Sequence, residues 1–262
     1  MENNKKLNVE TFVNRCLELV SRGEINLEGD FATENAEEYF YNSLVFCLLD
    51  AVFSMGAHYK SAKNVVINYA NRFDLNEEIY HLKEEQPTDY HKIEDFIKNY
   101  ERFQDNKCKN EPSFAKCILK NTQRTSSTGY SILKAEACYK IAQKLQEYKI
   151  NTISEFREIM REKDIFVRIK SEICSVTGQS SGIMFNYLCM LAGDDYTVKP
   201  DRWIKRFLND EKIFEESDND NISDDYILEL FISSCEILKK TYSQITPRYL
   251  DYQIWKYKKS VK

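Results

Sequence analysis

Turn-forming residues are scarce in this chain, and that scarcity limits the folds open to it. Its 262 residues include only 7 Gly and 4 Pro, too few for a sheet with many tight turns. Leu, Ile, Lys and Glu are abundant instead, which favours helices. Hydrophobic residues make up 42% of the chain, so a sizeable core can form. We therefore expect an all-α protein, either one large domain or two small lobes that share a groove.

Apolar residues recur at helical spacing along most of the chain. The first such segment, residues 8–21, ends at Arg22-Gly23, and Thr152 or Ser154 is placed to cap a later one. We find no strand alternation and no internal repeat. Further helices are expected at residues 36–54, 59–73, 91–104, 113–121, 132–148, 153–163 and 226–242, with a last helix from Pro247.

Hydropathy and cysteine usage both favour a cytoplasmic protein. No apolar run approaches the ~18 to 20 residues that span a bilayer, and no apolar stretch follows the N-terminus as it would in a signal peptide. The eight cysteines include no C-x-x-C pair and lie mostly in apolar helical contexts. We expect them to be small buried hydrophobes, with no disulfide and no metal held by side chains.

The net charge of −5 is distributed unevenly. Residues 207–229 contain nine acids and one base, Lys212, so the other residues together carry a charge of +3. Residues 248–262 contain five bases and one acid. The acidic segment is most simply a solvated loop, and the remaining chain can still present a basic face to phosphates.

Residues 174–188 suggest two helices joined by a tight turn. Gly178 permits a positive φ in that turn, and Gly182 would let the second helix approach another backbone closely. Ser180 and Ser181 could donate hydrogen bonds to a phosphate, as could the free N–H groups at the helix start. The alternative is an ordinary corner between helices with a serine N-cap.

A loop then delivers a carboxylate, Asp201, to the start of a basic helix. Because Asp201 follows Pro200, it could simply be an N-cap, or it could be a general base or a carboxylate that stabilises a cation. Four basic residues close in sequence would keep it ionised, namely Lys199, Arg202, Lys205 and Arg206.

Four further residues lie at positions where a structural or a functional role is expected. His58 and Tyr59 lie at a break between two helices and could be structural or inserted at a substrate. Arg124 lies in a polar loop before a helix. Trp255, in the aromatic and basic C-terminal helix, is expected in the core.

Taken in order, these features resemble the helix-hairpin-helix DNA glycosylase superfamily, over roughly residues 40 to 257. The family is typed by a hairpin, a Gly/Pro-rich connection and a downstream catalytic aspartate. The resemblance rests on five segments, which are Asp50-Ala-Val-Phe-Ser54, Lys134-Ala-Glu-Ala137, the Gly178 hairpin, Val198-Lys-Pro-Asp-Arg202 with Arg206, and Leu250-Asp-Tyr-Gln-Ile-Trp255.

The resemblance implies a two-lobed, glycosylase-like fold. Residues 1–35 would be an N-terminal helical extension and 36–262 the main domain, with the hairpin at 165–192 and the catalytic helix starting near 201. It also implies a monomeric base-excision repair hydrolase that acts on double-stranded DNA. That enzyme would flip a damaged or modified base into a cleft between the lobes.

The resemblance assigns roles to individual residues. Asp201 matches the catalytic aspartate, which stabilises an oxocarbenium-like sugar and directs water to C1′, and His58 and Tyr59 would form a substrate pocket or wedge. No cofactor is implied, apart from a monovalent cation that hairpin carbonyls often hold. The DNA-binding residues would be Thr177, Gly178, Gln179, Ser180, Ser181, Gly182, Lys199, Arg202, Arg206 and Arg124.

Several departures from the family pattern narrow the chemistry. Ser180 stands where bifunctional members have the lysine that forms a Schiff base, so the resemblance implies hydrolysis by water without lyase activity. Val176 replaces the first hairpin glycine, and the four-cysteine iron–sulfur motif is absent. Two other readings stay open: a non-catalytic helix-hairpin-helix DNA-binding protein and a helical protein-interaction domain.

Overall fold

The computed structural model describes residues 2–29, 40–81, 85–105, 113–127, 129–214 and 222–261. Regular structure in these ranges is helical and includes no strand, which confirms the all-α prediction. Two isolated antiparallel bridges join Tyr41 to Tyr80 and Arg124 to Leu133. No helix among the described residues is long and apolar enough to cross a membrane.

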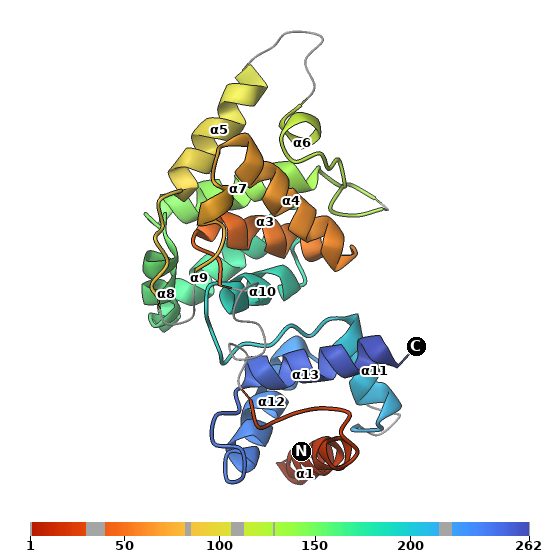
Figure 1. Ribbon diagram of the computed structural model, residues 1–262. Helices are drawn as coiled ribbons and strands as arrows, with labels where there is room; N and C mark the ends of the chain where they lie inside the picture. Colours follow the sequence, from red (N-terminus) through yellow and green to blue (C-terminus); the bar gives the residue numbers. More distant parts are fainter. Residues whose placement is uncertain are drawn as a thin grey trace. The chain divides into compact units, whose positions relative to one another are not determined.

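The chain divides into two compact helical units (Figure 1). The central unit comprises residues 36–193, and the terminal unit joins residues 1–35 to residues 194–262. The sequence had suggested residues 1–35 as an extension of a main domain that starts at residue 36. In the structure these residues are grouped with residues 194–262, and Phe12 among them packs against Phe207 and Phe231.

The central unit is built around α3 (Leu44–Ser54), which packs against α4, α5, α7 and α10. Every residue of α3 except Ser54 is buried, as expected for a helix that is apolar on all sides. Ser43 caps the helix and accepts the Val45 N–H at 3.1 Å. The helix therefore begins well inside the predicted range 36–54, of which residues 36–39 lie outside the described part of the chain.

The other helices in the described part of the central unit follow in chain order. They are α4 (Tyr59–Arg72), the 3-10 turn η1 (Asn76–Glu78), α5 (Ile93–Asp105), α6 (Phe114–Cys117), α7 (Lys134–Glu147), α8 (Ile153–Met160), α9 (Lys163–Cys174) and α10 (Ile183–Leu191). Aromatic rings fill the space between α3, α4, α5 and α6. Tyr69 is at the centre of this cluster, with ring centroids 6.5 Å from Phe46, 5.7 Å from Phe96 and 6.4 Å from Phe114.

The start of α8 shows how a local sequence signal sets a helix end. Thr152 accepts the Glu155 N–H at 3.1 Å, and the Glu155 carboxylate accepts the Thr152 N–H at 3.1 Å. This reciprocal capping box selects Thr152 over Ser154 as the cap. The single helix predicted at 153–163 ends at Met160, and α9 begins at Lys163.

The described part of the terminal unit contains four helices: α1 (Glu2–Ser21), α11 (Arg202–Asp210), α12 (Asp224–Leu238) and α13 (Pro247–Ser260). The ring of Phe12 in α1 is fully buried. Its centroid lies 5.9 Å from that of Phe207 in α11 and 5.0 Å from that of Phe231 in α12. A core shared by three helices accounts for the inclusion of the N-terminal residues in this unit.

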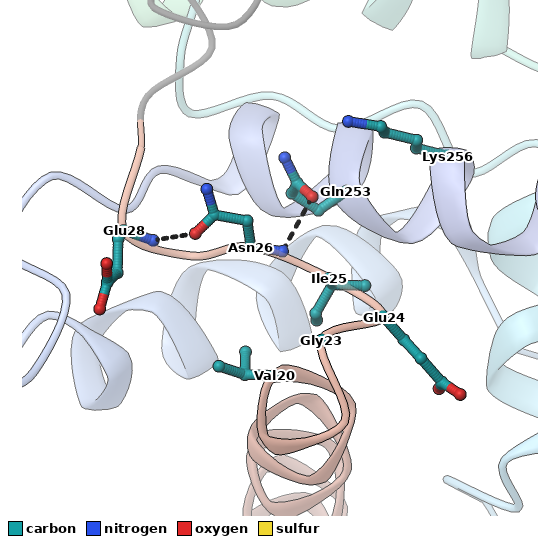
Figure 2. A pocket seen from close by; sticks show the side chains of 8 residues that line it. All are labelled: Val20, Gly23, Glu24, Ile25, Asn26, Glu28, Gln253 and Lys256. Atoms are coloured by element: carbon teal, nitrogen blue, oxygen red, sulfur yellow. Dashed lines mark hydrogen bonds between the residues drawn. The ribbon is translucent and has the colours of Figure 1, made fainter.

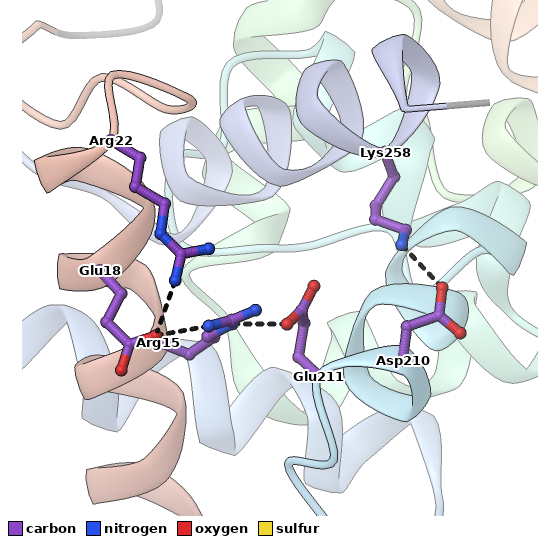
Figure 3. Close-up of polar contacts among 6 residues, drawn as sticks. All are labelled: Arg15, Glu18, Arg22, Asp210, Glu211 and Lys258. Carbon is purple, nitrogen blue, oxygen red and sulfur yellow. Dashed lines mark hydrogen bonds and ion pairs between the residues drawn. The ribbon is translucent and has the colours of Figure 1, made fainter.

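Part of the acidic segment also contributes to the terminal unit. Glu211 pairs with Arg15 of α1, and the Asp210 carboxylate accepts from Lys258 Nζ at 2.7 Å (Figure 3). The segment 207–229 is therefore more than the solvated loop that its composition predicted. Its first residues end α11 and its last ones begin α12, while residues 215–221 lie outside the described ranges.

Candidate active site

Asp201 is the N-cap of α11. Its Oδ1 accepts the backbone N–H of Trp203 at 2.7 Å and that of Ile204 at 3.4 Å. The preceding loop is anchored by the buried residues Val198 and Pro200. The capping role weighed from the sequence is thus present. Because both capping bonds use Oδ1 and the residue is only half-buried, Oδ2 is still compatible with a chemical role.

The first two turns of α11 carry exposed positive charge. Arg202 and Arg206 are exposed, and each guanidinium lies near the ring of Trp203, at 5.2 Å and 5.4 Å from its centroid. Such cation–π contacts restrain the two arginines without removing their charge. Lys205 is also exposed, but its Nζ pairs with Asp224 at 2.8 Å.

A second carboxyl group, that of Asp251 in α13, lies near Asp201. Asp251 is 6% exposed. The backbone N–H of Lys199 donates to one of its oxygens, while the buried Oδ1 has no hydrogen-bond partner among the described residues. Burial raises the pKa of Asp251 well above its usual value, and the negative charge of Asp201 raises it further. Lys199 and Arg248 lower the pKa, with smaller effects than burial.

Sequence reasoning did not identify Asp251 as a functional residue. Its segment Leu250-Asp-Tyr-Gln-Ile-Trp255 entered the family resemblance without a role for the acid. Leu250 and Ile254 are buried, and an acid between two apolar residues at helical spacing was the available signal. Arg248, one turn earlier, is 2% exposed, and its Nη1 lies 3.5 Å from Asp195 Oδ1. Trp255, predicted in the core, is half-buried with Lys259 Nζ 4.4 Å from its ring centroid.

The hairpin turn lies in the central unit between α9 and α10. Gly178 has φ +84°, as its sequence context predicted, and a Cβ there would meet Thr125 Cβ at 2.4 Å. Gly182 has φ +74° and is the N-cap of α10. A Cβ on Gly182 would make only ordinary contacts, so its backbone conformation, and not the predicted close approach, accounts for the glycine.

The polar residues of the turn differ in exposure. Ser180 and Ser181 are exposed, and Ser181 Oγ accepts the Ile183 N–H at the long distance of 3.4 Å. Thr177 is half-buried. Gln179 is only 3% exposed, and its Oε1 has no partner among the described residues. The turn therefore offers two serine hydroxyl groups to solvent and keeps its amide side chain inside.

The loop that carries Arg124 lies against this turn, through the contact of Thr125 with Gly178. The Thr125 N–H donates to Ile132 O at 2.9 Å, which holds the two sides of the loop together. Arg124 is exposed, and its Nε donates to Ser131 Oγ at 3.0 Å. The structure thus brings Arg124 and the hairpin turn, both predicted to bind DNA, onto one part of the central unit.

His58 and Tyr59 occupy the start of α4. His58 is the N-cap, is exposed, and makes no capping hydrogen bond with its side chain. Gly56 precedes it with φ +63°, which explains the predicted helix break. Tyr59 is the first residue of α4, and its side chain is not among those described.

The predicted site residues thus form two groups, one in each unit. The central unit holds the hairpin turn, Arg124 and His58, and the terminal unit holds Lys199, Asp201, Arg202 and Arg206. A pocket of about 410 Å³ in the terminal unit includes none of them. Figure 2 shows that pocket, where the Asn26 N–H donates to Gln253 Oε1 at 3.1 Å. It is lined by Val20, Gly23, Glu24, Ile25, Asn26, Glu28, Gln253 and Lys256.

Cysteine and metal-ligand geometry adds no further site in the described ranges. The seven cysteines found there are all free thiols, and no group of three or more His, Cys, Asp or Glu side chains could hold a metal. Five of these cysteines are buried, as predicted, whereas Cys117 is exposed and Cys174 half-buried. Cys108 lies outside the described residues.

Fold and site together define an all-α protein of two units, with a capped carboxylate beside an arginine-rich helix. Residues 22–259 match the model of a family described as a domain of unknown function, DUF8548. Since the match covers most of the chain, the protein belongs to that family. No curated protein and no solved structure matches it.

Proposed function

We propose that this protein is a monofunctional helix-hairpin-helix DNA glycosylase in which Asp201 is the catalytic carboxylate. One observation carries the proposal: a half-exposed carboxylate at a helix start, followed at once by the exposed residues Arg202 and Arg206. Phosphate groups bind arginines, and an acid held beside them can act on the sugar of a bound nucleotide. The division of the chain into two helical units is compatible with the two lobes of such an enzyme.

The proposed reaction is hydrolysis of the N-glycosidic bond of a flipped, damaged or modified base. The C1′–N bond breaks, its electron pair leaves with the base, and the sugar develops positive charge. Asp201 stabilises that charge and accepts a proton from the water whose oxygen bonds to C1′. The departing base takes up one proton, so water supplies both the hydroxyl group and the hydrogen that the products gain.

The central unit supplies the proposed second contact with double-stranded DNA. Exposed Ser180 and Ser181, together with the backbone N–H groups at the start of α10, are suited to a phosphate. Arg124 on the adjoining loop adds a positive charge. The proposal includes a monovalent cation at the hairpin carbonyls, a monomeric protein and a role in base-excision repair.

A non-catalytic DNA-binding protein is the second candidate. It is favoured by the two hydrogen bonds that commit Asp201 Oδ1 to capping α11, because a purely structural acid would be held in the same way. In that case the arginines and the hairpin turn would bind DNA and no base would be released.

Replacement of Asp201 by Asn separates the two candidates. Asn is as good an N-cap as Asp, so D201N should keep the stability of the wild type while it loses the charge. We expect release of base from duplexes with alkylated, oxidised, deaminated or hypermodified bases, and a fall in rate on the order of 10²–10⁴-fold in D201N. Chromatography of the released base measures both.

Two results would count against the enzyme. They are an unchanged rate in D201N and the absence of base release by the wild type from every duplex in the panel. DNA affinity that falls steeply with salt would then leave the non-catalytic candidate in place, since phosphate contacts release counterions. No affinity at low salt would rule out both candidates.

A further inference from the structure

Asp201 and Asp251 are two carboxyl groups in one structural neighbourhood of the terminal unit. Asp201 caps α11, and Asp251 lies on α13, which packs against α11. Lys199 links them, because its carbonyl oxygen accepts the Asp201 N–H at 2.6 Å and its own N–H donates to Asp251. The Asp251 Oδ1 is left buried without a partner among the described residues.

The surroundings of Asp251 favour a proton over a metal ion on that oxygen. Asp201 faces it from the start of α11, Lys199 from the preceding loop and Arg248 from α13 itself. Arg248 is 2% exposed and in turn pairs with Asp195, so a fixed positive charge already occupies this interior. That charge would repel a divalent cation. It also favours the ionised form of Asp251, but its effect on the pKa is smaller than that of burial, which favours the neutral acid.

The surroundings of the two carboxyl groups differ in how well they accommodate a negative charge. Asp201 accepts two backbone N–H groups at the positive end of the α11 dipole and is partly solvated. Asp251 accepts one N–H and is almost completely buried. We propose that Asp251 is protonated at neutral pH and forms with Asp201 a pair of carboxyl groups that carries a single negative charge, on Asp201.

The functional meaning of this pair rests on the proposed glycosylase activity. Asp251 would be a positioning residue: while neutral, it lets α13 pack beside the charged Asp201, and its ionisation would place two repelling charges together. Base release should then decline at alkaline pH as Asp251 loses its proton. No proton passes from Asp251 to substrate or water in this scheme.

The charge state can be measured without any substrate. In the full-length wild-type protein labelled with ¹³C-aspartate, the Asp251 carboxyl resonance should hold its protonated position at neutral pH. In D201N it should titrate at lower pH, since one of the causes of its raised pKa is removed. A wild-type Asp251 that is ionised at neutral pH overturns the proposal, as does a titration midpoint that D201N leaves unmoved.

Stability across pH gives an independent measurement. D251N should raise the denaturation midpoint at neutral pH, by an amount that shrinks as the pH falls toward the ordinary value of 3.8. Asp164→Asn, an exposed control on α9, should shift the midpoint little at any pH. A D251N curve parallel to that of the wild type, or a midpoint raised by Mg²⁺ or Ca²⁺ in the wild type alone, contradicts a protonated Asp251.

The activity measurement distinguishes failure of the pair from failure of the glycosylase hypothesis. If base release occurs, D251N should retain it at neutral pH and lose the alkaline decline that the wild type shows. An alkaline decline equal in both proteins would overturn the positioning role. If no duplex releases a base, the proposed function fails, and the NMR titration still decides whether the pair carries one charge.

Discussion

Lys134 shows how a single buried charge is accommodated in the central unit. Its Nζ donates to the backbone carbonyls of Phe53 at 3.2 Å and Met55 at 2.7 Å, and to Gln123 Oε1 at 3.3 Å. The two carbonyls belong to the C-terminal end of α3, where a cation also meets the negative end of the helix dipole. This lysine therefore caps α3 from another helix, a role that its place in the segment 134–137 did not reveal.

Replacing Lys134 by Met should destabilise the protein by about 2 kcal/mol at neutral pH, because buried carbonyls lose their donor. Burial lowers the pKa of Lys134 from 10.5 to about 8. Between those values the unfolded chain binds more protons than the folded protein, so this group makes stability rise with pH. Urea denaturation should show the wild type gaining stability over K134M across this window. A constant difference would mean that Lys134 titrates normally.

The hairpin turn at Gly178 should be sensitive to substitution by alanine. Gly178→Ala places an alanine at a strained positive φ, and its new Cβ would overlap Thr125 Cβ. The variant should therefore be less stable to unfolding by about 2–3 kcal/mol. Gly23→Ala is the matched control: Gly23 has φ +71° but nothing within 4 Å of its added Cβ, so strain alone should cost about 1 kcal/mol. Thermal denaturation of both variants measures the difference.

The overlap can be tested separately from the strain. Thr125→Gly removes the atoms that the new methyl group would meet, so the double variant with Gly178→Ala should recover most of the excess cost. Equal destabilisation by Gly178→Ala and Gly23→Ala would show that the hairpin turn and the Arg124 loop do not constrain one another.

The accuracy of the sequence predictions varied with the range of the interactions involved. Local signals worked well: the cap expected at Thr152 or Ser154, the positive φ expected at Gly178, and the cap that was one alternative for Asp201 all follow from neighbours within a few residues. Non-local partners were missed. Asp251 is buried near Asp201 only because α13 packs against α11. Lys134 caps α3 only because α7 packs against α3. Periodicity marks a buried face but does not identify what covers it.

The terminal unit is assembled from both ends of the sequence. Helix α1 completes a core with α11 and α12, and both tryptophans, Trp203 and Trp255, lie in this unit. Tryptophan fluorescence therefore reports on the terminal unit alone, whereas far-ultraviolet circular dichroism reports helices of both units. The two probes together can show whether the units unfold independently.

Phe12→Ala should shift the fluorescence transition. Phe12 is fully buried between Phe207 and Phe231, and its truncation should destabilise the terminal unit by about 3–5 kcal/mol. Phe96→Ala is the counterpart in the central unit, where Phe96 is equally buried against Tyr69. It should shift part of the dichroism transition and leave fluorescence unchanged. Each phenylalanine packs within its own unit. Phe96→Ala can therefore leave the fluorescence transition unchanged, while Phe12→Ala shifts it, only if the two cores are energetically separate. Equal shifts of both probes in both variants would show that the chain unfolds as one cooperative unit.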